Sequence, residues 1–210
     1  PSAGKTALSL QLAAGMAKQG KRVCYFSLET DPATLQARLI ANQLYAPLSA
    51  VKNKTLSINE LDRLADMKRW PLYIRSAAGK GVAWIKAQAL RMKADIIFVD
   101  YLQLIHERGS SDRYNAITEI SIALHELAQT TGILVVALAQ LNRNAARAEP
   151  SNADLRESGQ IEQDADAILL LSADGDTYFS RLTKNKEGRV GNAGLEFDKM
   201  TQRFTCVTAN

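Results

Sequence analysis

The sequence predicts an α/β domain in which a mostly parallel central sheet is flanked by helices and followed by antiparallel hairpins. Five short apolar runs, rich in β-branched and aromatic residues, are typical of strands: RVCYFSL, PLYIRS, DIIFVDYLQLI, ILVVALAQL and AILLLSA. Segments long enough for amphipathic helices separate the first four runs, and such alternation requires parallel pairing. After Leu171 the pattern changes to the close-set runs TYFSRLTKN, AGLEFD and RFTCV, separated by turn residues. We expect this end of the chain to add hairpins to the edge of the sheet.

Helix boundaries are marked by residues with known capping chemistry. Gly20 closes the first helical segment, and Asp31 before Pro32 suits an N-cap followed by the first helical position. Ser57 and Glu60 have the spacing of a capping box, in which each residue satisfies a free backbone N–H of the helix start. These signals place helices between the predicted strands.

Composition limits the class of protein. The chain has 210 residues, 46% of them hydrophobic, and a net charge of +4, so neither a nucleic-acid nor a membrane partner follows from charge alone. No apolar run approaches the length of a membrane span, so no membrane partner is expected. Cys24 and Cys206 lie too far apart for a zinc motif and are too few for a disulfide framework, which favours a reducing cytoplasm. No linker divides residues 1–210, so we expect a single domain.

The opening stretch PSAGKTALSL has the second half of a phosphate-binding loop, G-x-x-x-x-G-K-[ST]. Backbone N–H groups at such a helix start point toward phosphate, the lysine adds a full charge, and the hydroxyl can ligate Mg²⁺. The first glycine of the pattern would lie two positions before Pro1, so we expect the chain to be truncated within this loop. The alternative is a GKT triplet before an ordinary helix. The residues expected to surround the nucleotide phosphates are Ser2, Ala3, Gly4, Lys5, Thr6 and Ala7.

Three predicted strands end in polar residues suited to phosphate chemistry. Asp100 follows IIFV, where a carboxylate can hold Mg²⁺ together with Thr6. Glu29 follows YFSL, where it can orient and deprotonate a water that attacks the γ-phosphate; alternatively it is an acid at a helix start. Gln140 follows VVALA and can hydrogen-bond the γ-phosphate or the water; alternatively it is a solvated glutamine. In an open α/β sheet these strand ends meet at the ligand-binding edge.

Six segments give the sequence a specific resemblance. PSAGKTALSLQLA, YFSLET, IIFVDYLQLI, VVALAQLNR, ADLRESGQIEQDADAIL and LTKNKEGRVG resemble, in order and approximate spacing, the C-terminal motor domain of DnaB-type replicative DNA helicases. The resemblance implies a RecA-like P-loop NTPase fold, a homo-hexameric ring, Mg²⁺-dependent hydrolysis of ATP or another NTP, and translocation on single-stranded DNA to unwind duplex. It also implies primase and helicase-loader partners.

The resemblance assigns roles to individual residues. Lys5 and Thr6 match the phosphate-loop lysine and the Mg²⁺ hydroxyl, Glu29 the catalytic glutamate, Asp100 the Walker B aspartate and Gln140 the sensor glutamine. Each role agrees with the chemistry of the residue itself.

The resemblance also implies contacts to DNA. The segment from Arg143 to Arg147, and the stretch with Arg156, Glu157 and Gly159, match family loops that touch the DNA backbone in the central channel. Arg156 can pair with a phosphate and Gly159 permits close backbone approach. Arg143 and Arg147 alone would be read as a solvated loop.

One motif departs from the family pattern. Where the family has a Lys-x-Arg pair that reaches the neighbouring subunit's nucleotide, this chain has Lys184, Asn185 and Lys186. A lysine lacks the planar fork of an arginine finger, so either Lys186 or Arg189 is expected to supply the catalytic cation in trans. Both could instead be exposed hairpin residues.

Several other polar residues are expected to have structural roles. Gln103 and the acidic run Glu162, Asp164 and Asp166 are assigned to packing or subunit contacts, and His106 and His125 to structural or exposed positions. Two other functions remain open: a different RecA-like ATPase such as a recombinase or loader, and a non-catalytic assembly module, including a degenerate prophage-type relative.

Overall fold

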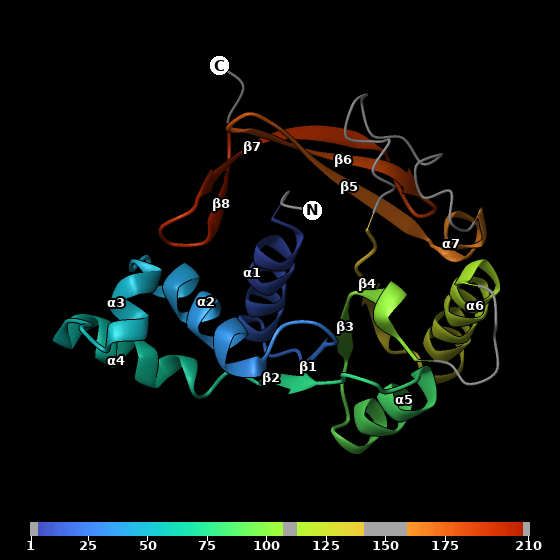
Figure 1. Cartoon of the computed structure of the whole chain (residues 1–210), viewed down its shortest axis with the longest axis horizontal. Coiled ribbons are helices and arrows are strands. Elements are labelled where there is room, and N and C mark those ends of the chain that lie inside the picture. Colours follow the sequence, from blue (N-terminus) through green and yellow to red (C-terminus); the bar gives the residue numbers. More distant parts are fainter. Residues whose placement is uncertain (1–3, 107–112, 141–158, 208–210) are drawn as a thin grey trace.

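The computed structural model describes residues 4–106, 113–140 and 159–207. Figure 1 shows two layers of strands, with the first helix of the chain between them. The parallel sheet consists of β1 (Val23–Ser27), β2 (Leu72–Ser76), β3 (Ile96–Asp100) and β4 (Leu134–Ala137), in the order β2-β1-β3-β4. All three pairings are parallel, which confirms the prediction from strand–helix alternation.

Helices precede, separate and follow these strands. They are α1 (Lys5–Lys18), α2 (Pro32–Leu44), α3 (Leu48–Asn53), α4 (Ile58–Met67), α5 (Val82–Arg91), α6 (Arg113–Thr131) and α7 (Gly159–Asp164), with a short 3-10 helix η1 (Leu102–Leu104) directly after β3. The run DIIFVDYLQLI is therefore a strand followed by a turn of helix, not one continuous strand.

Alternate residues of β1 and β3 point to opposite faces of the sheet. Tyr25 and Phe98 pack on one face with α1 and α2. Phe26 and Val99 pack on the other face with α5 and α6. The sheet centre is therefore buried on both sides, which explains why its strands read as continuous apolar runs.

The predicted caps are present. Asp31 accepts a hydrogen bond from the backbone N–H of Thr34 at 2.9 Å, and Ser57 and Glu60 form a reciprocal capping box. Gly20 follows the end of α1 in the left-handed conformation, with φ of 83°.

The C-terminal strands form a second sheet, which corrects the expectation that they extend the first. The strands β5 (Ala167–Asp174), β6 (Thr177–Asn185), β7 (Gly191–Asp198) and β8 (Arg203–Cys206) pair antiparallel in chain order. Rather than pairing with the parallel strands, this sheet packs against α1: Phe204 of β8 and Tyr178 of β6 share an apolar cluster with Ala7. Side-chain burial on that helix, not strand pairing, holds the second sheet in position.

Two further observations concern the cysteines and the lengths of the helices. Both cysteines are free thiols, Cys24 buried and Cys206 exposed. None of the helices in the described ranges has the length and apolar character that a membrane crossing requires.

Candidate active site

The start of α1 has a backbone conformation that only glycine adopts easily. Gly4 has a φ of 76°, and a Cβ on it would lie 2.7 Å from the ring of Phe204. The main chain of Phe204 is also held to α1, because Gln11 Nε2 donates to its carbonyl at 2.8 Å and Gln11 Oε1 accepts from its N–H at 2.9 Å. The second sheet therefore packs against the phosphate-loop residues through Phe204. No pattern in the sequence indicates this role of Phe204, because the residue lies near the opposite end of the chain.

Thr6 and Asp100 meet at the carboxyl edge of the parallel sheet. Thr6 Oγ1 donates to Asp100 Oδ2 at 2.8 Å, across 94 residues of sequence. Asp100 is buried at 6% exposure, so the carboxylate is shielded from bulk water. A hydroxyl and a carboxylate in contact beside a helix start are suitable oxygen donors for a divalent cation and its waters.

Lys5 lies close enough to the carboxylates of Asp100 and Glu29 for their charges to act on it. Burial lowers the pKa of Lys5 below its ordinary value, and the negative charges of Asp100 and Glu29 offset part of that shift. A partly desolvated ammonium has lost some of its hydration and would regain favourable interactions by binding an anion. The arrangement is suited to phosphate binding.

Glu29 lies just beyond β1 at the same edge. Ser27 pairs with Asp100 in the register of β1 and β3, and the N–H of Leu28 donates to the carbonyl of Asp100 at 2.8 Å. Glu29 itself is exposed. The structure thus brings Lys5, Thr6, Glu29 and Asp100 to one edge, as expected from strand ends in parallel sheets.

Gln140 follows β4 and is held by a residue that the sequence assigned to packing. Gln103 Nε2 donates to the carbonyl of Gln140 at 3.1 Å, and Gln103 Oε1 accepts from the Gln140 N–H at 3.2 Å. Leu102, beside Gln103, donates its N–H to the carbonyl of Leu138 at 2.9 Å. The segment after β4 is therefore fixed to η1 by side-chain and main-chain bonds.

A buried tyrosine adjoins the Thr6–Asp100 pair, and sequence reasoning missed it. Tyr25 donates its hydroxyl to Asp100 Oδ2 at 2.8 Å, and its hydroxyl also lies 2.8 Å from Ser9 Oγ. Its position in the strand could have indicated this role. Alternate residues of a strand share a face, and in the register of β1 and β3 Tyr25 lies on the same face of the sheet as Asp100.

Of the C-terminal cations, Lys184 lies in β6, and Lys186 and Arg189 lie in the turn between β6 and β7. Lys184 Nζ donates to the carbonyls of Glu162 and Gln163 near the end of α7. Lys186 pairs with Asp166 at 2.6 Å. Arg189 is exposed, and its carbonyl accepts from Asn185 Nδ2 at 3.2 Å. No hydrogen bond or ion pair between described residues joins these three side chains to the site around Asp100.

Most of the predicted DNA contacts and the first loop residues lie outside the described residues. These are Ser2, Ala3, Arg143, Arg147, Arg156 and Glu157. Gly159 is described: it is exposed at the start of α7, and a Cβ placed on it would have no described atom within 4 Å. Asp164 accepts bonds from Ser121 and Gln160 at 2.7 Å each, which is consistent with the expected packing role.

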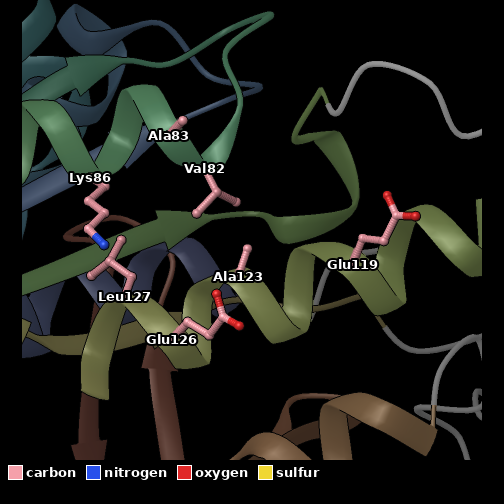
Figure 2. Close-up of a pocket in the computed structure, with 7 residues that line it drawn as sticks. All are labelled: Val82, Ala83, Lys86, Glu119, Ala123, Glu126 and Leu127. Carbon is pink, nitrogen blue, oxygen red and sulfur yellow. The ribbon is translucent and has the colours of Figure 1, made fainter. Parts of the chain in front are cut away.

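A shallow hollow of about 310 Å³ lies elsewhere, between α5 and α6. Figure 2 shows the residues that line it: Val82, Ala83, Lys86, Glu119, Ala123, Glu126 and Leu127. It contains none of the predicted site residues. No group of three or more potential metal-ligating His, Cys, Asp or Glu side chains is present in the part of the chain that the structure describes.

Comparison with known proteins agrees with this geometry. The family model of the DnaB-like helicase C terminal domain matches residues 1–206. The replicative DNA helicase DnaB of Treponema pallidum (strain Nichols) is 35% identical over 98% of this chain and 50% of its own length. A probable plasmid replicative DNA helicase of Chlamydia trachomatis is 35% identical over 99% of this chain and 49% of its own length. The chain thus spans about half the length of these relatives.

Solved structures agree on the fold. A solved ATPase domain superimposes with a TM-score of 0.90 and 29% identity, over 99% of this chain and 82% of that one. A DnaB-like replicative helicase, described together with its interactions with primase, superimposes with a TM-score of 0.87 and 30% identity, over 97% of this chain and 55% of that one. The fold is therefore RecA-like, and the chain belongs to the family of the DnaB-like helicase C-terminal domain.

Proposed function

We propose that this chain is the motor of a replicative DNA helicase, which hydrolyses ATP or another NTP and uses the energy to move along single-stranded DNA. The observation that carries the proposal is the Thr6–Asp100 hydrogen bond of 2.8 Å, formed beside Lys5 at the start of α1. It joins the two expected oxygen donors for a nucleotide-bound metal at the ligand-binding edge of the sheet.

The residues present fit a magnesium ion. Thr6 and Asp100 would hold it, since both supply oxygen and Mg²⁺ is usually bound by one or two protein groups together with phosphates and water. When bound, the ion would supply positive charge that neutralises the developing charge on the transferred phosphoryl group.

The remaining residues divide the work of hydrolysis. Lys5 binds phosphate, together with backbone N–H groups at the start of α1. Glu29, exposed at the same edge, accepts the proton of the attacking water. Gln140, fixed by Gln103, binds the γ-phosphate or the water through its side chain. Lys186 or Arg189 acts on the nucleotide of a neighbouring subunit, and Lys184 contacts that nucleotide.

The proposed assembly is a homo-hexameric ring, as the resemblance to helicase motor domains implies. It is supported by the partners of Lys184, Lys186 and Arg189, because no hydrogen bond or ion pair between described residues joins these side chains to their own chain's Asp100. The proposed channel contacts to single-stranded DNA are Arg143, Arg147, Arg156, Glu157 and Gly159. A primase and a helicase loader are proposed as protein partners, the primase because a similar helicase is described with one.

We also propose that residues 1–210 form one motor domain, which is supported by the packing of the second sheet on α1.

The experiment is a DNA-dependent ATPase and unwinding assay on the native polypeptide that contains this chain. We expect Mg²⁺-dependent hydrolysis, stimulation by single-stranded DNA, and unwinding of a forked duplex. Hydrolysis without unwinding would favour a different RecA-like ATPase. Nucleotide binding without hydrolysis, with or without DNA, would favour a non-catalytic assembly module.

A further inference from the structure

A tyrosine hydroxyl lies directly behind the Thr6–Asp100 pair. Tyr25 is in the middle of β1 with 0% exposure, and its hydroxyl is 2.8 Å from Asp100 Oδ2. Asp100 Oδ2 therefore accepts two hydrogen bonds, one from Thr6 and one from Tyr25, each 2.8 Å long.

The available protons fix the direction of these bonds. A tyrosine hydroxyl carries a proton at neutral pH, so the Tyr25 hydroxyl can donate to Asp100 Oδ2, which lies 2.8 Å away. An ionised carboxylate only accepts, so the Tyr25 proton points to Asp100. Ser9 has one proton for two acceptors, the Tyr25 hydroxyl at 2.8 Å and the Thr6 carbonyl at 3.0 Å. Ser9 thus connects Tyr25 to the first turn of α1.

The ring of Tyr25 cannot move away from this position easily. It stacks on Phe98, with ring centroids 5.7 Å apart and planes inclined by 11°. Both rings belong to the buried cluster between the sheet and α1. The hydroxyl is therefore presented by a rigid support.

We propose that Tyr25 is a positioning residue for Mg²⁺–nucleotide binding. Its hydroxyl and that of Thr6 occupy Oδ2 of Asp100 and so fix the rotation of the carboxylate. Among the hydrogen bonds between described residues none involves Oδ1, which leaves this oxygen for water bound to the metal. The proposal rests on the function proposed above and adds a residue to it.

The contrasting possibility is that Tyr25 only fills the core. In that case the loss of its hydroxyl would lower thermal stability without changing how nucleotide binding depends on Mg²⁺. Outer hydrogen-bond partners of metal ligands, by contrast, typically contribute about tenfold or more to metal affinity. Metal dependence therefore separates the two possibilities.

The test is Tyr25→Phe, which retains the ring and its stacking on Phe98. Binding of a fluorescent ADP analogue to the native polypeptide is titrated with Mg²⁺ and, separately, in EDTA. We expect Tyr25→Phe to raise the Mg²⁺ concentration for half-maximal binding by about tenfold. Affinity in EDTA should stay within about twofold of the unsubstituted protein, since the tyrosine does not contact phosphate.

Controls separate the possible failures. Tyr73→Phe removes a hydroxyl from the neighbouring strand β2, where the side chain is 44% exposed, and should leave the Mg²⁺ dependence unchanged. Tyr25→Met also lacks the hydroxyl, and its flexible side chain can adapt to the space left in the core. It is the second variant if a thermal melt shows that Tyr25→Phe does not fold. In an Asp100→Asn background, Tyr25→Phe should cause no further loss.

Two results would overturn the inference. The first is an unchanged Mg²⁺ dependence in both Tyr25 variants while the unsubstituted protein responds to Mg²⁺. The second is a loss of nucleotide affinity in the Tyr25 variants that is as large in EDTA as it is with Mg²⁺. If the unsubstituted protein itself binds nucleotide without any Mg²⁺ effect, the proposed function fails together with the inference about Tyr25. The unsubstituted protein thus distinguishes failure of the proposed function from failure of the inference alone.

Discussion

The side-chain amide of Gln103 pairs with the main chain of Gln140, donating to its carbonyl at 3.1 Å and accepting from its N–H at 3.2 Å. This pair of bonds has the pattern that a neighbouring strand would provide. The two bonds fix the main chain of Gln140, which lies beyond the end of β4 at Ala137. Gln140 is the residue assigned as the sensor of the γ-phosphate.

We predict that Gln103→Ala lowers DNA-stimulated turnover by about tenfold or more, because a misplaced group near the chemistry loses its effect on the transition state. Nucleotide affinity should change little, since the hydrogen bonds that the Gln103 side chain makes to described residues all go to the Gln140 main chain. Steady-state ATPase kinetics and nucleotide titrations measure both quantities. Gln129→Ala on the exposed face of α6 is the matched control, and equal losses in the two variants would contradict the prediction.

Glu29 and Lys5 should separate catalysis from binding. Glu29→Gln is expected to abolish most turnover with nucleotide affinity nearly unchanged, because it removes a base used only in the transition state. Lys5→Ala should lose affinity as well, because its charge contacts the ground-state phosphates. Parallel ATPase and binding assays decide; near-normal turnover in Glu29→Gln would show that Glu29 is not the base.

The pKa shift of Lys5 predicts a pH dependence of stability without nucleotide. Its folded pKa is lowered by burial, so the folded state binds this proton less tightly than the unfolded state does. The free energy of unfolding should therefore rise as pH increases from the folded pKa toward the ordinary lysine value, and the cost of the buried charge is fully present below that window. Lys5→Met should remove this dependence.

Chemical denaturation of both forms, from neutral pH up to the ordinary lysine pKa of 10.5, measures the difference in the free energy of unfolding. The Lys5→Met form should be at least as stable as the unsubstituted protein at neutral pH, with the gap closing at high pH. A gap that widens with pH would contradict the predicted direction of the shift.

Gly4→Ala should damage the phosphate loop in two ways. The φ of 76° would strain an alanine by about 1–3 kcal/mol, and the new methyl group would lie 2.7 Å from the ring of Phe204. We expect weaker nucleotide binding and a lower melting temperature. Adding Phe204→Leu should restore part of the affinity by relieving the contact; no restoration would assign the whole effect to backbone strain.

Lys186 and Arg189 differ in their hydrogen-bonding partners. Lys186 forms a 2.6 Å ion pair with Asp166, and it must give up this pair to reach another subunit's nucleotide. We predict that Lys186→Ala and Arg189→Ala each lower DNA-stimulated ATPase without weakening the hexamer, and that the larger loss identifies the trans-acting cation. That loss can approach the roughly 10³-fold effect of an arginine finger.

Two further variants sharpen this assay. Asp166→Asn frees Lys186 and should raise turnover only if Lys186 is the acting cation. Mixing either alanine variant with Glu29→Gln subunits should restore some activity, because an intact Glu29 site can then face an intact hairpin. If neither alanine change alters turnover in assembled hexamers, the cation must come from another segment.

The sequence by itself determined the parallel sheet and the edge at which Lys5, Thr6, Glu29 and Asp100 meet. Strand–helix alternation and capping are local patterns, and parallel strands place their carboxyl ends together whatever the rest of the chain does. The resemblance to helicase motor domains rested on motifs of the same local kind. These features are readable because each depends on neighbours within a few residues.

Tertiary structure decided the contacts between distant segments. The second sheet packs on α1 instead of extending the first sheet, because its apolar side chains are buried against that helix. The pairings of Tyr25 with Asp100, Gln103 with Gln140 and Lys186 with Asp166 depend on side-chain directions fixed by this packing. No spacing along the chain encodes such directions, so only the folded structure could identify these partners.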